Sequence, residues 1–242
     1  MITKKEAYET IKAGARTFYA DREGLLVTNR NLSFALDKQF MSIYESLAED
    51  VKERGKLWRL HVFLWAFHNG MNIEGDLVEC GVYRGFSSAV AVRYTEFNKA
   101  KKRLLLFDTW DGIPEDQFDK GRDANLDTLK KYKDPANYIK TRERFENFEN
   151  VELYRGRVPE VFSAVNLPEK ISFLHLDMNT SIAEVGALEV LFSRVSTGAV
   201  ILLDDFGLLL ASEQMIAESN WFRARGFLVC ELPTSQAIVI KR

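Results

Sequence analysis

Short apolar runs that alternate with helical patterns fill the chain from residue 76 onward, and this alternation constrains the fold most. The runs are 76–80 (DLVEC), 103–107 (RLLLF), 150–154 (NVELY), 171–176 (ISFLHL) and 198–203 (GAVILL). Helical patterns lie between and after them, near 86–98, 122–147, 159–165, 182–194 and 210–225. Near-continuous apolar strands separated by helices are typical of a parallel sheet that is buried on both faces. With right-handed crossovers, they predict a doubly wound, Rossmann-like α/β fold.

The two ends of the chain predict additions to this sheet. Residues 227–241 (FLVCELPTSQAIVIK) indicate two strands joined by a turn around Pro233 to Ser235, an antiparallel hairpin at the sheet edge. Near the N-terminus, 3–20 and 37–54 are amphipathic and rich in helix formers. The apolar stretch 57–69 predicts a further helix that is stopped by Gly70.

Length and charge limit the class of protein. A chain of 242 residues suits one α/β domain, which we assign to 57–242, after an N-terminal helical extension at 1–56. The net charge of −2 and the lack of a basic block argue against binding to nucleic acid or an anionic membrane. No apolar run approaches the roughly 18 residues of a membrane span, and the polar start lacks the apolar stretch of a signal peptide. Cys80 and Cys230 lie in apolar runs, so we expect buried free thiols in a reducing, cytoplasmic environment.

A glycine pair follows the first apolar run, at the edge where open parallel sheets bind ligands. Gly81 allows a tight turn, and Gly85 lets a ligand approach the next helix. Free amides at the start of that helix can hold a carboxylate. The turn predicts a small ligand, and a plain strand–helix connection is the alternative. The candidate contact residues are Glu79, Cys80, Gly81, Val82, Gly85, Ser87 and Ser88.

The residues at the ends of the second and third runs narrow the chemical class of the ligand. Asp108, roughly 20–30 residues after the glycine turn, can accept hydrogen bonds from both hydroxyls of a ribose. It is followed by Thr109 and by Trp110, which can flank an adenine ring. Gly156 and Val158 can offer backbone contacts to the adenine. These residues favour a nucleoside but do not separate a methyl donor from a nicotinamide. A capping aspartate, a core tryptophan and a plain turn are the alternatives.

Three aspartates follow the fourth and fifth runs. Asp177 ends one run, and the adjacent Asp204 and Asp205 end the other. Adjacent carboxylates at a nearly buried strand end repel each other, and a hard cation relieves that repulsion. Because the two strands are neighbours in this topology, we expect the three carboxylates to converge. Oxygen ligands without cysteine predict Mg²⁺, Ca²⁺ or Mn²⁺ rather than zinc. The alternative is that Asp204 or Asp205 caps the next helix.

The histidines and one long connection are less specific. His61 and His68 share a face of the apolar helix 57–69, which predicts core or subunit-interface positions and makes this helix a candidate homodimer contact. His175 points to the same side of its strand as Asp177, either to orient a metal ligand or as a core histidine. Residues 113–147 are long and charged for a connection, so they predict a lid or a solvated helix with a mobile loop.

Several of these stretches resemble the macrocin O-methyltransferase family of class I methyltransferases, which modify deoxysugars in macrolide and aminocoumarin biosynthesis. The resemblance runs from about residue 55 to the end of the chain, with the motifs in the family's order and spacing. It implies a seven-stranded sheet with a C-terminal hairpin, S-adenosylmethionine as cofactor, and Mg²⁺. The matching texts are GDLVECGVYRGFSS (75–88), LLLFDTWDGIP (104–114), FLHLDMNTSIAEVGALE (173–189) and STGAVILLDDFG (196–207).

The resemblance also implies roles for the site residues. Glu79, Gly81 and Ser87 would face the methionine part of the cofactor, and Asp108 would hold its ribose. The metal would bind two neighbouring hydroxyls of the acceptor and lower the pKa of one, so that the alkoxide attacks the donor methyl group. The metal ligands implied are Asp177, Asp204 and Asp205.

One position departs from the family. A second aspartate, proposed as the general base, usually follows two positions after the first, and here that position is Asn179, which cannot take a proton. The metal alone, Asp177 or Asp205 is then left to activate the acceptor. We predict an O-methyltransferase that acts on a small hydroxylated acceptor such as a sugar or polyol. The alternatives are an inactive cofactor-binding or scaffold protein and a nicotinamide oxidoreductase. The missing G-x-G-x-x-G motif argues against the oxidoreductase.

Overall fold

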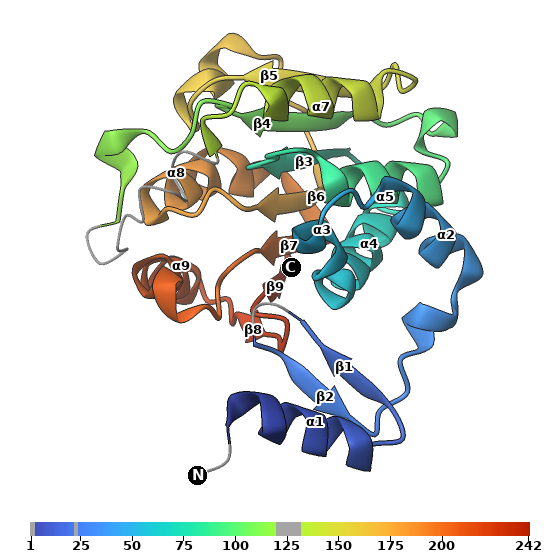
Figure 1. Ribbon diagram of the computed structural model, residues 1–242. Helices are drawn as coiled ribbons and strands as arrows, with labels where there is room; N and C mark the ends of the chain where they lie inside the picture. Colours follow the sequence, from blue (N-terminus) through green and yellow to red (C-terminus); the bar gives the residue numbers. More distant parts are fainter. Residues whose placement is uncertain (1–2, 22–23, 120–131) are drawn as a thin grey trace.

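The computed structural model describes residues 3–21, 24–119 and 132–242. Its centre is a seven-stranded sheet in the order β5-β4-β3-β6-β7-β9-β8 (Figure 1). The five strands β3 to β7 pair in parallel, and β9 runs antiparallel to both β7 and β8. This confirms the predicted doubly wound fold with a C-terminal hairpin. The strands are β3 Asp76–Cys80, β4 Leu104–Asp108, β5 Val151–Arg155, β6 Ile171–Leu176, β7 Val195–Leu203, β8 Cys230–Glu231 and β9 Ala237–Ile240.

The path of the chain through the sheet fixes where a ligand can bind. From β3 the chain moves outward to β4 and β5, then returns to β6, which pairs with the other side of β3. Connections therefore leave β3 and β6 in opposite directions, and a crevice opens at their carboxyl ends. In the register of these two strands, Glu79 lies beside His175. The predicted ligand residues lie at or just after the carboxyl ends of strands, so they gather around this crevice.

Helices cover both faces of the sheet (Figure 1). On one face lie α2 (Lys38–Leu47), α4 (Leu57–Met71) and α5 (Phe86–Tyr94), and on the other lie α8 (Ser181–Leu191) and α9 (Ser212–Ala224). Side chains alternate between the two cores along each strand: Leu104 and Leu106 belong to the first core, Leu105 and Phe107 to the second. Both sides of the central strands are therefore buried, which explains why the sequence runs are almost continuously apolar.

The N-terminal region differs in part from the prediction. Helix α1 covers Lys4–Gly14, and the predicted helix over 3–20 is wrong at its end, because β1 (Phe18–Ala20) pairs with β2 (Leu26–Thr28) in a separate antiparallel sheet. The predicted helix over 37–54 is divided into α2 and α3 (Val51–Arg54). Asp50 causes the division, because its carboxylate accepts from the amides of Lys52 and Glu53 and begins a new helix.

Two single-residue predictions are also wrong. Gly70 does not stop α4, which continues to Met71. A Cβ at Gly70 would lie 2.8 Å from the Cβ of Phe173, so the glycine lets the helix approach β6 closely. Cys80 is a buried free thiol as predicted, but Cys230 is exposed, because it lies on β8 at the edge of the sheet.

The long connection after β4 is described in part. Helix α7 covers Ala136–Phe145, within the predicted helical pattern at 122–147, while 120–131 lie outside the described residues. The predicted helix at 159–165 is a short 3-10 helix over Glu160–Ala164. Among the described helices, none has the length and apolar character needed to cross a membrane. Other 3-10 segments are Ser33–Leu36, Phe97–Lys99, Glu115–Gln117, Phe192–Arg194 and Leu209–Ala211.

Candidate active site

A cavity of about 410 Å³ opens at the carboxyl ends of β3, β4 and β6, within the size range of small-molecule sites. Several predicted site residues do not line it: Cys80 and Ser88 are fully buried, and Gly85 and Asp204 also lie behind its wall. The predicted residues that do line it are Glu79, Gly81, Val82, Ser87, Asp108, Thr109, Trp110, Gly156, Val158, Asp177 and Asp205.

The glycine turn is tight because two loops touch there. Gly81 has a φ of +87°, and a Cβ on it would lie 2.0 Å from the carbonyl oxygen of Asp177. The amide of Asp177 in turn donates to the carbonyl of Cys80 at 2.8 Å. Gly85, with a φ of +68°, begins α5. Only glycine fits at position 81 without displacing the loop after β6, so this part of the cavity wall is fixed by backbone packing.

Asp108 holds the glycine turn as well as facing the cavity. Its Oδ2 accepts from the amides of Val82 at 2.7 Å and Tyr83 at 2.8 Å, and its Oδ1 accepts from the amide of Trp110 at 2.7 Å. A carboxylate oxygen has two lone pairs, so Oδ1 can still accept from a ligand hydroxyl. Trp110 is buried, and its Nε1 donates to the carbonyl of Tyr83 at 2.8 Å. The tryptophan is therefore a core residue that also lines the cavity.

A buried chain of charged groups runs behind the glycine turn. Glu79, 3% exposed, accepts from the hydroxyl of Ser88 and lies 3.1 Å from Nδ1 of His175. Nε2 of His175 is 4.0 Å from Oδ1 of Asp204. Burial acts to lower the pKa of His175, but the carboxylates of Asp204 and Glu79 outweigh it and raise that pKa to about 10. His175 therefore lies between two carboxylates, with Nδ1 at hydrogen-bond distance from Glu79 and Nε2 without a hydrogen-bond partner among the described residues.

The two adjacent aspartates converge on one arginine. Nη2 of Arg59, in the first turn of α4, pairs with Oδ2 of Asp204 and with Oδ1 of Asp205 at 2.8 Å. Neighbouring residues of a strand point to opposite faces, but Asp205 has a φ of +55°, which brings both carboxylates to the same guanidinium. Nε2 of Gln236 donates to the other oxygen of Asp204 at 2.9 Å. Burial acts to raise the pKa of Asp204, yet Arg59 holds that pKa well below its usual value.

The predicted metal ligands already take part in contacts within the protein. The ligand atoms of His175, Asp177 and Asp204 lie within 4.8 Å of one another. Oδ2 of Asp204 pairs with the guanidinium of Arg59, and its Oδ1 accepts from Nε2 of Gln236 at 2.9 Å. Burial, and then repulsion by Asp204 and Asp205, raise the pKa of the Asp177 carboxyl well above its usual value. The carboxylates converge as predicted, but Asp204 and Asp205 already share an internal cation, so a divalent ion would have to compete with the guanidinium of Arg59.

Comparison with known proteins identifies the family. A sequence profile described as Macrocin-O-methyltransferase (TylF) matches residues 54–227. The chain belongs to the macrocin O-methyltransferase family. It is therefore an O-methyltransferase that uses S-adenosylmethionine as methyl donor. None of the curated proteins compared with the chain matches it in sequence.

Solved structures share the fold of this methyltransferase at low sequence identity. The O-methyltransferase NovP matches with a TM-score of 0.64 and 17% identity, over 92% of this chain and 90% of NovP. The calicheamicin methyltransferase CalS11 matches with a TM-score of 0.63 and 15% identity, over 88% of this chain and 94% of CalS11. PaMTH1 of Podospora anserina, solved with S-adenosylhomocysteine (SAH), matches with a TM-score of 0.54 and 11% identity, over 100% and 97% of the two chains.

Two buried residues that sequence reasoning missed hold the loops of the methyltransferase in place. Oε1 of Glu184, on α8, accepts from the amides of Met178 at 2.9 Å and Asn179 at 3.0 Å. Gln214, on α9, donates to Oε2 of Glu184 and to the carbonyl of Asp204, both at 3.0 Å. This network fixes the loops after β6 and β7 relative to each other. The available sequence signal was Glu184, one of two acidic residues inside the otherwise apolar helix SIAEVGALEVL.

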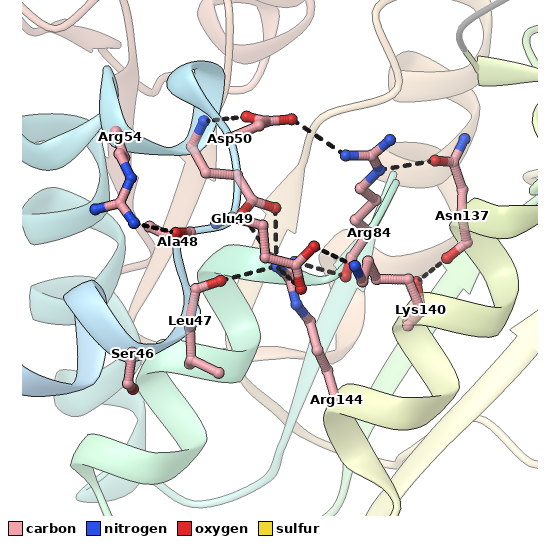
Figure 2. Close-up of polar contacts among 12 residues, drawn as sticks. Ser46, Leu47, Ala48, Glu49, Asp50, Arg54, Arg84, Asn137, Lys140 and Arg144 are labelled. Atoms are coloured by element: carbon pink, nitrogen blue, oxygen red, sulfur yellow. Dashed lines mark hydrogen bonds and ion pairs between the residues drawn. The ribbon is translucent and has the colours of Figure 1, made fainter.

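The N-terminal region forms a further wall of the methyltransferase cavity. Asp50 lines the cavity and pairs with Arg84 of the glycine turn at 3.1 Å. Arg84 also donates to Asn137 of α7 at 3.0 Å. Figure 2 shows Arg84 between Asp50 and Asn137. Nearby, Arg144 of α7 pairs with Glu53 of α3 at 2.9 Å. Because Asp50 and Asn137 both contact Arg84, α3 and α7 are tied to the same turn.

Proposed function

We propose that this methyltransferase acts on a hydroxyl group of a sugar or a related polyol. The observation that carries the proposal is that one cavity extends from the glycine turn and Asp108 to the carboxylates of Asp177 and Asp205. The first end suits the nucleoside of the methyl donor, and the second offers hydrogen-bond acceptors to a hydroxylated molecule. The likeness to CalS11, described as a TDP-rhamnose 3'-O-methyltransferase, supports a sugar-type acceptor.

We assign the cofactor to the β3 and β4 side of the cavity. Oδ1 of Asp108 accepts from a ribose hydroxyl, while its bonds to the turn amides keep the carboxylate in place. Gly81 leaves room for the methionine part, and Ser87 offers an amide near the start of α5 to its carboxylate. Gly156 and Val158 line the cavity on the β5 side, which supports a backbone contact to the adenine.

In the proposed reaction, the acceptor oxygen attacks the methyl carbon of S-adenosylmethionine in line with the C–S bond. That bond breaks, its electron pair stays on sulfur, and SAH leaves. The acceptor proton moves to the carboxylate of Asp177, which lines the cavity next to the amide of Asn179. No covalent intermediate on the protein is needed, so the rate depends on positioning and electrostatics. The Mg²⁺ expected from the sequence stays a prediction, and no step here depends on it.

The test is a panel of nucleotide sugars and vicinal diols, with formation of SAH as the readout. The wild type is expected to methylate at least one member. Asp177→Asn should lower kcat by about 100-fold or more, the usual contribution of a general base, without a change in SAH affinity. The exposed Asp111→Asn serves as the control. If the wild type binds SAH but methylates no hydroxyl compound, the alternative of a cofactor-binding or scaffold protein is favoured.

A further inference from the structure

The acidic end of the cavity contains a positive charge that belongs to the chain itself. Arg59 lies in the first turn of α4, and its side chain is only 4% exposed. A guanidinium carries its charge at any physiological pH, so it compensates the two aspartates permanently. Arg59 does not line the cavity, whereas Asp205 does. The arginine therefore lies behind the cavity wall and positions the carboxylate that faces the acceptor.

Three of the aspartate oxygens that a metal would use already contact side-chain N–H donors of the protein. Nη2 of Arg59 contacts one oxygen of Asp204 and one of Asp205, and Gln236 donates to the second oxygen of Asp204. Gln236 is itself buried and is held by the hydroxyl of Thr234 at 3.0 Å. A divalent ion bound to Asp204 would have to displace these N–H donors, or share an oxygen with a guanidinium of like charge.

Contacts around the start of α4 hold Arg59 next to the two aspartates. The amide of Trp58 donates to the hydroxyl of Tyr19 at 3.1 Å, which ties this turn to β1. Phe63, one helical turn after Arg59, packs edge-on against His175 at 4.9 Å between ring centroids. Lys56, just before the helix, lines the cavity and acts on Asp177 and Asp204 as a second positive charge. The aspartates thus face two cationic side chains from one segment.

We propose that the guanidinium of Arg59 takes the place of a divalent cation in this methyltransferase, so that the aspartates at the ends of β6 and β7 bind no metal. The arginine is a positioning residue: it neutralises Asp204 and Asp205 and fixes the direction of Asp205 toward the acceptor. Its part in methyl transfer rests on the proposed function, but its exclusion of a metal is a binding property that is measured without turnover.

The test is a titration of the purified, metal-free protein with Mn²⁺, followed by the loss of the free-ion electron paramagnetic resonance signal. The wild type is expected to show no saturable site below about 1 mM, and Arg59→Lys, which keeps a positive charge, should behave alike. Arg59→Gln should gain about one site per chain, at least about 100-fold tighter, because a like charge has been removed. Adding Asp204→Asn to Arg59→Gln should abolish that site.

Two results would overturn the proposal. One is a wild-type site for Mn²⁺ of micromolar affinity that Asp204→Asn removes, and this result stands even if Arg59→Gln does not fold. The other is a folded Arg59→Gln protein that gains no Mn²⁺ site. Calorimetric binding of SAH, measured on the same samples, reports on folding of the cavity. SAH binding together with the diol panel tests the proposed function separately, so the two failures can be told apart.

Discussion

Asp108 and Asp204 end parallel strands of the same sheet, yet they are stabilised in different ways. Asp108 accepts from the backbone amides of Val82, Tyr83 and Trp110. Asp204 accepts from the side chains of Arg59 and Gln236, which come from the first helix of the family match and from the C-terminal hairpin. One carboxylate is held by main-chain donors close to the ligand turn, the other by side chains from distant segments.

This difference separates what a motif guarantees from what it leaves open. Any sequence that forms the glycine turn supplies the amides that Asp108 needs, so the cofactor end follows from the motif. Side-chain donors can change by single substitutions while the aspartates stay. The same aspartate motif can therefore face a metal ion in one protein and, as we propose, an arginine in this one. Three predictions test the comparison, beginning with the largest expected effect.

Removing the charge of Arg59 should affect stability most. Arg59→Gln removes the guanidinium that the buried Asp204 and the partly buried Asp205 share, and we expect the free energy of unfolding to fall by about 3–5 kcal/mol. Urea denaturation measures the change. Arg103→Gln is the matched control, because Arg103 pairs with Asp76 at 2.9 Å but is about one-third exposed, and it should cost about 1 kcal/mol or less. Equal losses of unfolding free energy in both variants would show that the buried Arg59 stabilises the protein no more than the partly exposed Arg103.

In a third carboxylate, that of Glu218, the effect of burial outweighs the side-chain hydrogen bonds that act against it. Burial raises the pKa of Glu218, on α9, from an ordinary 4.5 to about 7. Between these values the native state binds more protons than the unfolded state, so the free energy of unfolding falls as pH rises, by up to about 3 kcal/mol. Glu218→Gln should therefore match the wild type near pH 4 and be more stable near pH 8.

Thermal or urea unfolding across this pH range measures the effect of Glu218. The difference between variant and wild type reports on Glu218 together with Glu184, because the carboxyl of Glu218 also raises the pKa of Glu184. Glu169→Gln is the control, since Glu169 is exposed and its substitution should shift stability equally little at every pH. A Glu218→Gln variant whose advantage does not grow with pH would contradict the prediction.

Substitution of Asp108, which backbone amides hold in place, should give the smallest effect. The quantity affected is the affinity for the cofactor. Asp108→Asn weakens the hydrogen bonds that this side chain accepts from three backbone amides and from a ribose hydroxyl. SAH should therefore bind more weakly by about 1–3 kcal/mol. Isothermal titration calorimetry measures it, with the exposed Asp111→Asn as control. Unchanged affinity would remove Asp108 from the cofactor site and leave it only the turn-holding role.

Strands and helices were predicted best where the pattern extends over several residues. The runs at 76–80 and 171–176 coincide with β3 and β6, because burial on both faces makes a strand apolar throughout. The N-terminal strands were missed, because β1 and β2 have three residues each and carry no period that distinguishes them from a helix end. Cys230 was misplaced because an apolar run does not reveal which side of an edge strand is exposed.

The sequence by itself determined the sheet, the glycine turn and the set of carboxylates at its edge, because each follows from neighbouring residues and from the order of the strands. Tertiary structure alone decided what those carboxylates contact. Arg59 and Asp205 are 146 residues apart, and no spacing or period links them. Their pairing depends on how α4 packs across β6 and β7, and on the left-handed backbone at Asp205 that turns two adjacent side chains toward one guanidinium.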